Sequence, residues 1–242
     1  MAQSAQVQQQ QQTLQLLDWL GFTALLEQAP FALKLSLEAE ARFRKAEPQQ
    51  VDAWRRELEP RMKPQVLRQD LVDYIAERYR AETFQQVQAL LEQPLPKRVR
   101  YFDLAMAQPG VVKSLQDFRV QAQGEPHPGR RELAQEIDAA TATSLLAAVL
   151  QTGIAERVRR VASGRSGDEQ EVQAQIGERQ RYLAPLTVDY VLYAYRYLRD
   201  DELTAYRDLM RDDKIQWLLD IGRQGLTATL EGAAVRPPDQ KR

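Results

Sequence analysis

The chain has 242 residues, 43% of them hydrophobic and 28% charged, a composition that argues against disorder throughout and supports a folded protein with a substantial core. Its 33 basic and 34 acidic side chains give a formal net charge of −1, which provides no global attraction for nucleic acid or for an anionic membrane surface. The absence of cysteine excludes disulfides, thiolate metal ligands and cysteine nucleophiles.

The first twelve residues are polar and include an unbroken run of glutamine from Gln8 to Gln12. We expect residues 1–12 to form a disordered polar leader. They contain neither the basic nor the hydrophobic region of a signal peptide. Two interpretations are open from these residues: a mature exported protein whose signal peptide was removed, or a polar leader on a cytoplasmic protein.

Apolar residues then recur at helical spacing through an N-terminal half, residues 13–123. Gly21 predicts a bend or break in the first helix, and Pro30 is placed to start the next one. The longer helices expected in this half cover about residues 13–28, 30–43, 65–81, 83–93 and 97–107, with shorter ones at 51–58 and 111–122.

Two prolines and two glycines among residues 124–129 cannot extend a helix, and they predict the boundary to a C-terminal half, residues 130–232. Ser166, Thr187 and Asp200 are expected to cap the helices that follow them. Helices are expected at about 130–161, 168–181, 188–198, 202–211 and 215–230, followed by a disordered tail at 233–242. With those of the N-terminal half, these are twelve segments of helical pattern, and we predict an all-α bundle of about nine or ten helices.

Two segments 119 positions apart have matching apolar patterns, which predicts two pseudo-repeated helical hairpins. Every apolar or aromatic position of the first segment stays apolar or aromatic in the second. The matched pairs are Leu71 and Tyr190, Tyr74 and Tyr193, Ile75 and Ala194, Tyr79 and Leu198, Phe84 and Leu203, Val87 and Tyr206, Leu90 and Leu209, Leu91 and Met210, Val99 and Leu218, and Phe102 and Ile221.

Residues suited to catalysis are few. His127 is the only histidine, and its proline-flanked loop is a poor place to hold a rigid base. The carboxylates at 200–202 and 212–213 are best explained as residues at helix starts, where they complement the helix dipole. The loop at 163–167 lacks the lysine and the preceding strand of a phosphate-binding loop. We predict no catalytic residue, no metal and no cofactor, and favour a protein that is not an enzyme.

Tyrosines are concentrated near the end of the chain. On a helix, Tyr190, Tyr193 and Tyr197 share a face, while Tyr195 points elsewhere. Such residues either form a surface for a partner or ligand, or fill the contact between the two halves. The candidate binding residues are Tyr190, Tyr193, Tyr195, Tyr197 and Tyr206.

Short basic clusters occur at 97–100 and 157–160. In a chain with balanced charge they are interpreted as solvated helix faces, so no nucleic-acid partner is predicted. The most apolar segment, residues 144–154, is too short to span a bilayer, which needs roughly 18 apolar residues. We predict no membrane-spanning segment.

At the paired hairpins the sequence resembles an uncharacterised bacterial family of exported helical proteins, the domain of unknown function number twenty fifty-nine. The pattern is an apolar helix, an acidic turn, Glu plus Leu, and a helix with aromatic and Leu residues, as in residues 198–210. The resemblance covers about residues 65–102 and 187–226, but the break at 95–96 and 213–214 lacks the family's glycine. It implies a periplasmic location and offers no known reaction or functional residues.

These observations favour a non-enzymatic periplasmic binding or protein-interaction module, with an unknown protein or a small apolar ligand as its partner. One alternative is a small-molecule or lipid carrier with a cavity between the halves. Another is a carboxylate-dependent hydrolase, which no feature of the sequence specifically indicates. A cytoplasmic location is the alternative to the periplasm.

Overall fold

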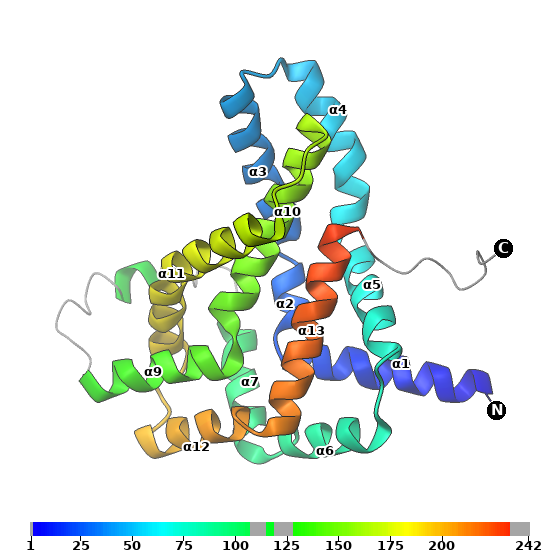
Figure 1. Ribbon diagram of the computed structural model, residues 1–242. Coiled ribbons are helices and arrows are strands. Elements are labelled where there is room, and N and C mark those ends of the chain that lie inside the picture. Colours follow the sequence, from blue (N-terminus) through cyan, green and yellow to red (C-terminus); the bar gives the residue numbers. More distant parts are fainter. Residues whose placement is uncertain (1, 107–114, 119–127, 233–242) are drawn as a thin grey trace. The chain divides into compact units, whose positions relative to one another are not determined.

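A computed structural model describes residues 2–106, 115–118 and 128–232 (Figure 1). Within these ranges every regular element is helical, with twelve α-helices, one 3-10 helix and a helical turn at 115–118, and no strand. The predicted all-α fold is confirmed, although twelve helices exceed the expected nine or ten. Most of the expected helix at 111–122, His127 and the expected tail at 233–242 lie outside the described residues.

The chain divides into two compact units, and neither is a continuous half. The first comprises Met1–Tyr79, Leu145–Arg179 and Asp220–Arg242, and the second comprises Arg80–Ser144 and Gln180–Leu219. This differs from the predicted boundary at 124–129. Three helices, α10 (Thr143–Ser163), α11 (Glu169–Ala194) and α13 (Asp213–Glu231), contribute residues to both units. A stretch rich in proline and glycine therefore does not mark the division.

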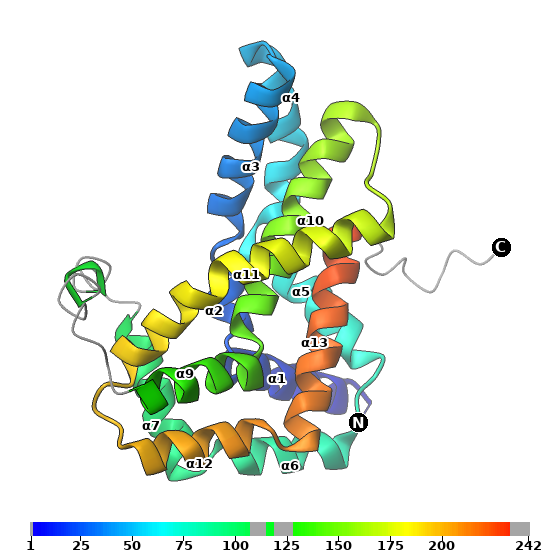
Figure 2. The same cartoon turned by 60° about the vertical axis from the view of Figure 1, so that its left-hand side comes forward.

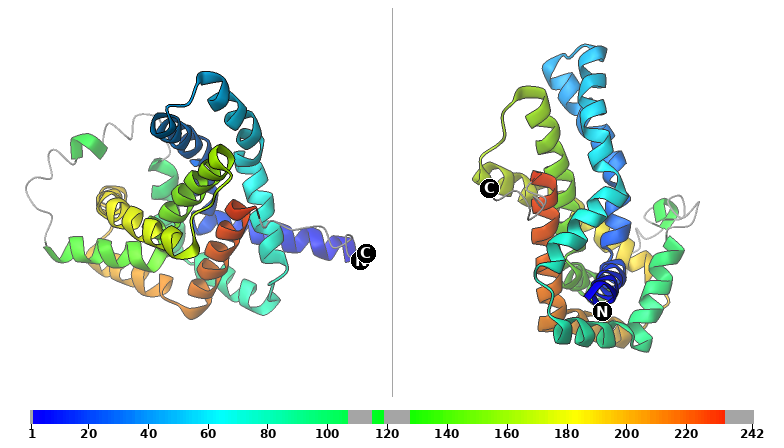
Figure 3. Two further views of the ribbon diagram at one scale, coloured as in Figure 1. Left: turned by 45° about the horizontal axis from the view of Figure 1, so that its top comes forward. Right: turned by 90° about the vertical axis from the view of Figure 1, so that its right-hand side faces the viewer.

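The first unit begins with helices that proline and glycine delimit. Gly21, with φ 82°, separates α1 from α2, as the sequence predicted, and Pro30 lies in the first turn of α3. The α3–α4 hairpin can be followed in Figure 3. The elements are α1 (Ala2–Trp19), α2 (Phe22–Leu26), α3 (Ala29–Arg44), α4 (Pro48–Leu58), η1 (Glu59–Met62) and α5 (Pro64–Ala76).

Residues 2–12, expected to be a disordered leader, lie in α1. Their polar side chains have partners near the end of α5, which explains the difference. Gln9 donates a hydrogen bond to the carbonyl of Ala76 (3.1 Å), and the Tyr79 hydroxyl donates to Gln12 Oε1 (2.6 Å). A run of glutamine is thus held in a helix by contacts that sequence composition does not reveal.

The core of the first unit is apolar and closely packed around Phe22, which is fully buried. Two glycines of α13 bring that helix close to its neighbours. A Cβ at Gly222 would lie 2.9 Å from Cε2 of Phe22, and one at Gly225 would lie 2.7 Å from Cδ1 of Leu71. Other side chains buried in this unit are Leu16, Leu17, Leu26, Leu58, Met62, Leu67, Ile75, Leu150, Ile154, Val158 and Leu226.

Replacement of Gly222 by alanine tests this packing. The added methyl group must displace the ring of Phe22, and we expect the free energy of unfolding to fall by about 1–3 kcal/mol. Gly177→Ala is the matched control, because nothing lies within 4 Å of its Cβ position in α11. That variant should be neutral or gain up to about 1 kcal/mol from helix propensity. Urea unfolding of both variants makes the comparison, and equal stabilities would contradict the packing.

The second unit contains α6 (Ala81–Leu91), α7 (Pro94–Met106), α9 (Pro128–Thr141) and α12 (Asp200–Met210). Helices α9 and α12 lie side by side (Figure 2). Glu136 of α9 forms ion pairs with Arg207 of α12 (2.6 Å) and with Arg211, the residue just after α12 (3.8 Å). The apolar side chains buried in this unit include Phe84, Val87, Leu91, Val99, Leu133, Ile137, Val191, Leu192, Leu198, Leu203, Met210, Ile215 and Leu218.

The long helix expected at 130–161 is broken at Ala142, which has φ 54°. The carboxylate of Asp138 explains the break, because it accepts hydrogen bonds from the Ser144 amide (2.8 Å) and hydroxyl (2.6 Å). It thereby satisfies an amide in the first turn of α10 that would otherwise be unpaired. The predicted single helix is therefore two helices, α9 and α10.

By contrast, the two helices expected at 168–181 and 188–198 form a single helix, α11. Helix α11 runs through Pro185, where the sequence predicted an interruption before residue 188. Proline has no N–H to donate to the carbonyl of Arg181, one turn earlier. Both Pro185 and Arg181 are exposed, so water can hydrate this carbonyl. Thr187 does not cap a helix, and its hydroxyl donates to the carbonyl of Leu183 within α11 (3.3 Å).

Two other predicted caps are shifted by one or two residues. Asp168, and not Ser166, accepts a hydrogen bond from a first-turn amide of α11, that of Glu171 (2.7 Å). Helix α12 begins at Asp200 and its N-cap residue is Arg199, whereas the sequence predicted Asp200 as the cap.

The segments matched at an offset of 119 residues share only part of their helix bounds: α5 and α11 begin at Pro64 and Glu169, and α7 and α13 end at Met106 and Glu231, which do not follow the offset. Helices α6 and α12 begin at Ala81 and Asp200 and end at Leu91 and Met210, and α7 and α13 begin at Pro94 and Asp213. Each pair is offset by 119 at these points. Burial follows the same pattern: Phe84, Val87 and Leu91 are buried in α6, and Leu203, Tyr206 and Met210 in α12.

Among the described residues, no single helix is long and apolar enough to cross a membrane. The pair Gly129–Thr141 and Thr143–Ser163 meets the criterion only when both helices are taken together across a bend of 53°.

Candidate functional site

The five candidate tyrosines lie in the second unit, on the last turns of α11, in the turn that follows, and on α12 (Figure 1). Their exposures differ widely. Tyr195 and Tyr206 are buried, with 5% and 8% of their surfaces exposed, whereas Tyr197 is 66% exposed. Tyr190 and Tyr193 are half-buried. The group therefore divides into an inner set (Tyr190, Tyr195, Tyr206) and an outer set (Tyr193, Tyr197).

The inner set surrounds the carboxylate of Asp103 on α7. The hydroxyls of Tyr190 and Tyr195 both donate to Asp103 Oδ1, at 3.0 and 2.8 Å. The ring of Tyr206 packs edge-on against that of Tyr195, with centroids 6.1 Å apart and planes at 75°. Two phenols and one carboxylate thus join α7 to the end of α11.

The sequence predicted that Tyr195 points away from Tyr190, and this is wrong because the helix ends earlier than expected. Helix α11 ends at Ala194, so Tyr195 lies in the turn after it. Arg130 holds this turn: its guanidinium donates to the carbonyls of Tyr195 (3.0 Å) and Leu198 (2.9 Å) and also pairs with Asp200. The turn directs Tyr195 to the same carboxylate oxygen as Tyr190.

Burial determines the electrostatics of the inner set. It raises the pKa of Asp103 to about 6, although the hydrogen bonds from Tyr195 and Tyr190 and the charge of Arg100 act to lower it. Burial, followed by the charge of Asp103, also raises the pKa of Tyr190, Tyr195 and Tyr206 above the usual range. The three tyrosines are therefore neutral near neutral pH, Tyr190 and Tyr195 as donors to Asp103, and Asp103 exchanges its proton close to that pH.

Asp103 is a functional candidate that the sequence-based search missed. It lies four residues after the buried Val99, so an acidic residue occupies the inward side of an amphipathic helix. An acidic residue at an inward position could have been noticed in the sequence. Its partners Tyr190 and Tyr195 could not, because they lie 87 and 92 residues away. In the described ranges no group of three or more His, Cys, Asp or Glu side chains could hold a metal ion.

The outer set stacks on a guanidinium. Cζ of Arg196 lies over the rings of both Tyr193 and Tyr197, 4.2 and 4.5 Å from the two centroids, and the guanidinium donates to the Tyr193 carbonyl (2.6 Å). Both contacts are within the range of cation–π attraction. The ring of Tyr193 also packs against Phe118, with a centroid distance of 5.3 Å. These contacts hold an arginine and two tyrosines together at the end of α11.

Helix α7 extends this exposed surface. Phe102 packs against Tyr197 (6.5 Å between centroids) and against Tyr101 (6.0 Å), and Tyr101 is 70% exposed. Leu104, three residues further along, is 55% exposed. Arg98 donates to Glu202 (2.7 Å) and to the Tyr197 carbonyl (3.3 Å) and so fixes α7 against the turn. The outer aromatic surface comprises Tyr101, Phe102, Leu104, Tyr193, Arg196 and Tyr197.

Comparison with known proteins does not identify relatives. No protein-family model matches the chain, and no curated protein or solved structure shows detectable similarity to it. Membership of the exported helical family that the hairpins resemble therefore stays a prediction.

The proton equilibrium of Asp103 predicts how stability depends on pH. Because its folded pKa of about 6 lies above the ordinary value of 3.8, its contribution to stability is complete at low pH and is lost as pH rises toward and through 6. The shift corresponds to at most about 3 kcal/mol. Asn at this position can still accept the tyrosine hydrogen bonds but does not titrate. As pH rises from roughly 5 to 8, the free energy of unfolding of the parent should fall by about 1–2 kcal/mol more than that of Asp103→Asn.

The comparison is made as a difference between variant and parent in chemical unfolding at each pH, because burial also raises the pKa of Asp70 and Asp138. Glu178→Gln, at an exposed position of α11, is the control and should keep the parent's slope. A parent and an Asp103→Asn variant with parallel pH profiles would show that Asp103 is not held in a dry site.

Proposed function

We propose that the protein is a non-enzymatic protein-interaction module and that the outer aromatic surface binds its partner. The observation that carries this proposal is the contact of Arg196 with the rings of Tyr193 and Tyr197, which continues through Phe102 into exposed aromatic and apolar residues of α7. Tyrosine and arginine are, with tryptophan, the residue types enriched among the energetically dominant residues of protein interfaces.

The inner and outer sets have different roles in this proposal. Tyr190, Tyr195 and Tyr206 are held by Asp103 and by burial, so they position the turn and do not contact the partner. Tyr101, on α7, and Tyr197, in the turn after α11, expose most of their surfaces. Rigid aromatic side chains lose little conformational entropy on binding, which favours them as anchors.

The charge of Arg196 indicates the chemistry of the partner segment. The guanidinium lies over two rings and uses one of its donors on the Tyr193 carbonyl. Its other edge can form a bidentate pair with a carboxylate. We therefore expect the partner to present an Asp or Glu side chain next to apolar residues that cover Tyr101 and Tyr197.

Site-specific cross-linking in the native host tests the proposal. A photo-reactive phenylalanine analogue is introduced separately at Tyr101, Tyr197 and Tyr182, the last as a control that is 68% exposed on α11. We expect one protein to be cross-linked from positions 101 and 197 and not from 182. The same set of products from all three positions would contradict recognition by the outer aromatic surface.

The identified partner is then used in calorimetric titrations. Loss of an anchoring aromatic residue typically costs 2 kcal/mol or more, so Tyr197→Ala should weaken binding by about thirtyfold. Arg196→Lys keeps the charge but loses the planar, bidentate contact and should weaken binding by about tenfold. Tyr182→Ala should bind like the parent. Unchanged affinity for Tyr197→Ala would eliminate the proposed anchor.

Two further proposals concern origin and location. The agreement of helix bounds and burial between α6 and α12 supports an internal duplication of a helical hairpin. The periplasmic location rests on the family resemblance, and the lack of cysteine is compatible with an oxidising compartment. Fractionation of host cells tests the location: recovery of the protein with cytoplasmic markers would reject it.

A further inference from the structure

Helix α3 of the first unit is apolar on two sides. Ala29, Ala32, Leu33 and Leu37 are buried against the rest of the unit. On the solvent side, residues at intervals of four form an apolar row: Phe31, Leu35, Ala39 and Phe43. Phe31 is 64% exposed, Leu35 48% and Phe43 81%. Single exposed apolar residues are ordinary, but a row of them along one helix indicates a surface that something covers.

Basic residues lie beside this apolar row. Lys34, Arg42 and Lys45 are exposed on the solvent side of α3 and just after it. Glu38 is the exposed carboxylate among them, and Glu40 is paired with Arg44. At the C-terminal end of α3, Phe43 therefore stands within a run of three cations, Arg42, Arg44 and Lys45. Cations there also complement the helix dipole, but the dipole gives no reason for an exposed phenylalanine.

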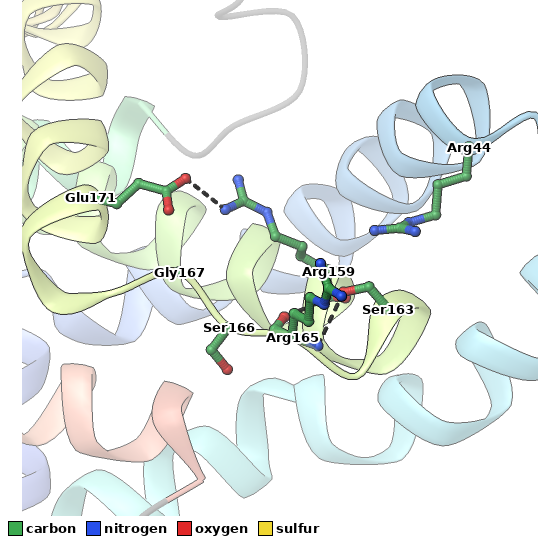
Figure 4. A pocket seen from close by; sticks show the side chains of 7 residues that line it. All are labelled: Arg44, Arg159, Ser163, Arg165, Ser166, Gly167 and Glu171. Carbon is green, nitrogen blue, oxygen red and sulfur yellow. Dashed lines mark hydrogen bonds and ion pairs between the residues drawn. The ribbon is translucent and has the colours of Figure 1, made fainter.

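A pocket of about 400 Å³ lies next to this end of α3 and is lined by Arg44, Arg159 and Arg165 (Figure 4). Arg159 is neutralised within the chain, because it pairs with Glu156 (2.9 Å) and Glu171 (3.0 Å). The side chain of Arg165 forms no ion pair with the described residues. The pocket thus adds a further cation to the charged end of α3.

An anionic lipid surface offers both kinds of contact that this part of α3 needs. Its acyl boundary accepts apolar side chains, and its phosphates, a few ångströms further out, accept cations. From Phe31 to Phe43 the row extends over about 18 Å, enough for a helix to lie along the interface. The overall charge of −1 gives no long-range attraction, but a local cluster acts within the screening length of about 10 Å.

We propose that the first unit binds anionic membrane surfaces through α3. Phe43, Leu35 and Phe31 enter the boundary between head groups and acyl chains. Arg42, Lys45 and Arg165 pair with lipid phosphates. This surface lies in a different unit from the outer aromatic surface, so the two proposals stand or fall separately.

Vesicle sedimentation tests the proposal with the full chain. Vesicles of phosphatidylcholine alone are compared with vesicles that contain about one third phosphatidylglycerol. We expect binding only to the anionic vesicles. Phe43→Ser should reduce the partition coefficient about tenfold. The double variant Arg42→Glu, Lys45→Glu should reduce it more, because each cation near the surface raises the partition coefficient about fivefold. Tyr182→Ser and Arg181→Glu, at exposed positions of α11, should leave binding unchanged.

The cysteine-free chain allows a second readout that locates the contact. Ala39→Cys lies in the apolar row and keeps its phenylalanines, and Tyr182→Cys is the control. Each single cysteine is labelled with an environment-sensitive dye. Anionic vesicles should shift the emission to shorter wavelength at position 39 and not at position 182. Circular dichroism melting confirms that each variant is folded.

Three results would overturn the proposal: no sedimentation with anionic vesicles, equal sedimentation with neutral vesicles, or a dye at position 39 that stays in water while the protein sediments. Self-association that is lost in Phe43→Ser, measured by analytical ultracentrifugation without vesicles, would show instead that a second copy covers the row. Binding at low salt that survives high salt unchanged would also contradict a role for the cations.

Discussion

The contact of Arg130 with the end of α11 determines how the candidate site is arranged. Its guanidinium binds the carbonyls of Tyr195 and Leu198, and the helix ends at Ala194. The turn that follows places Tyr195 on Asp103 and leaves Tyr197 exposed. If the helix continued, Tyr197 would share a face with Tyr190 and Tyr195 would point elsewhere, the reverse of what the turn produces. One capping interaction therefore divides a cluster of aromatic residues into a buried support and an exposed surface.

Asp103 connects this support to the ionisation of the protein. A carboxylate that accepts two phenolic hydrogen bonds at Oδ1 in a largely buried site has a pKa raised to about 6, because the cost of burial outweighs the hydrogen bonds that favour the charge. Such a group lowers stability at neutral pH while it specifies how α7 meets the end of α11. The exposed Tyr101 and Leu104 flank Asp103 on α7, so the same contact positions the outer aromatic surface.

Local sequence signals predicted the elements well where the determinants are local. Gly21 and Pro30 punctuate the chain as expected, and the bounds of α6 and α12 repeat at the offset that the apolar pattern indicated. The break at Ala142 depends on a hydrogen bond between Asp138 and Ser144, which periodicity does not encode. The role of Asp103 depends on tyrosines about ninety residues away in the sequence. Tertiary partners of this kind are the part of the site that one sequence does not supply.

The division of the tyrosines is tested most directly by hydroxyl-radical footprinting of the full chain, with oxidation mapped to each tyrosine by mass spectrometry. Tyr101 and Tyr197 should be oxidised rapidly and Tyr195 and Tyr206 slowly, in the order of their exposed fractions. Arg130→Ala should release the turn and raise the oxidation of Tyr195, with Tyr182 unchanged. Equal oxidation of Tyr195 and Tyr197 in the parent protein would contradict the separation into a buried support and an exposed surface.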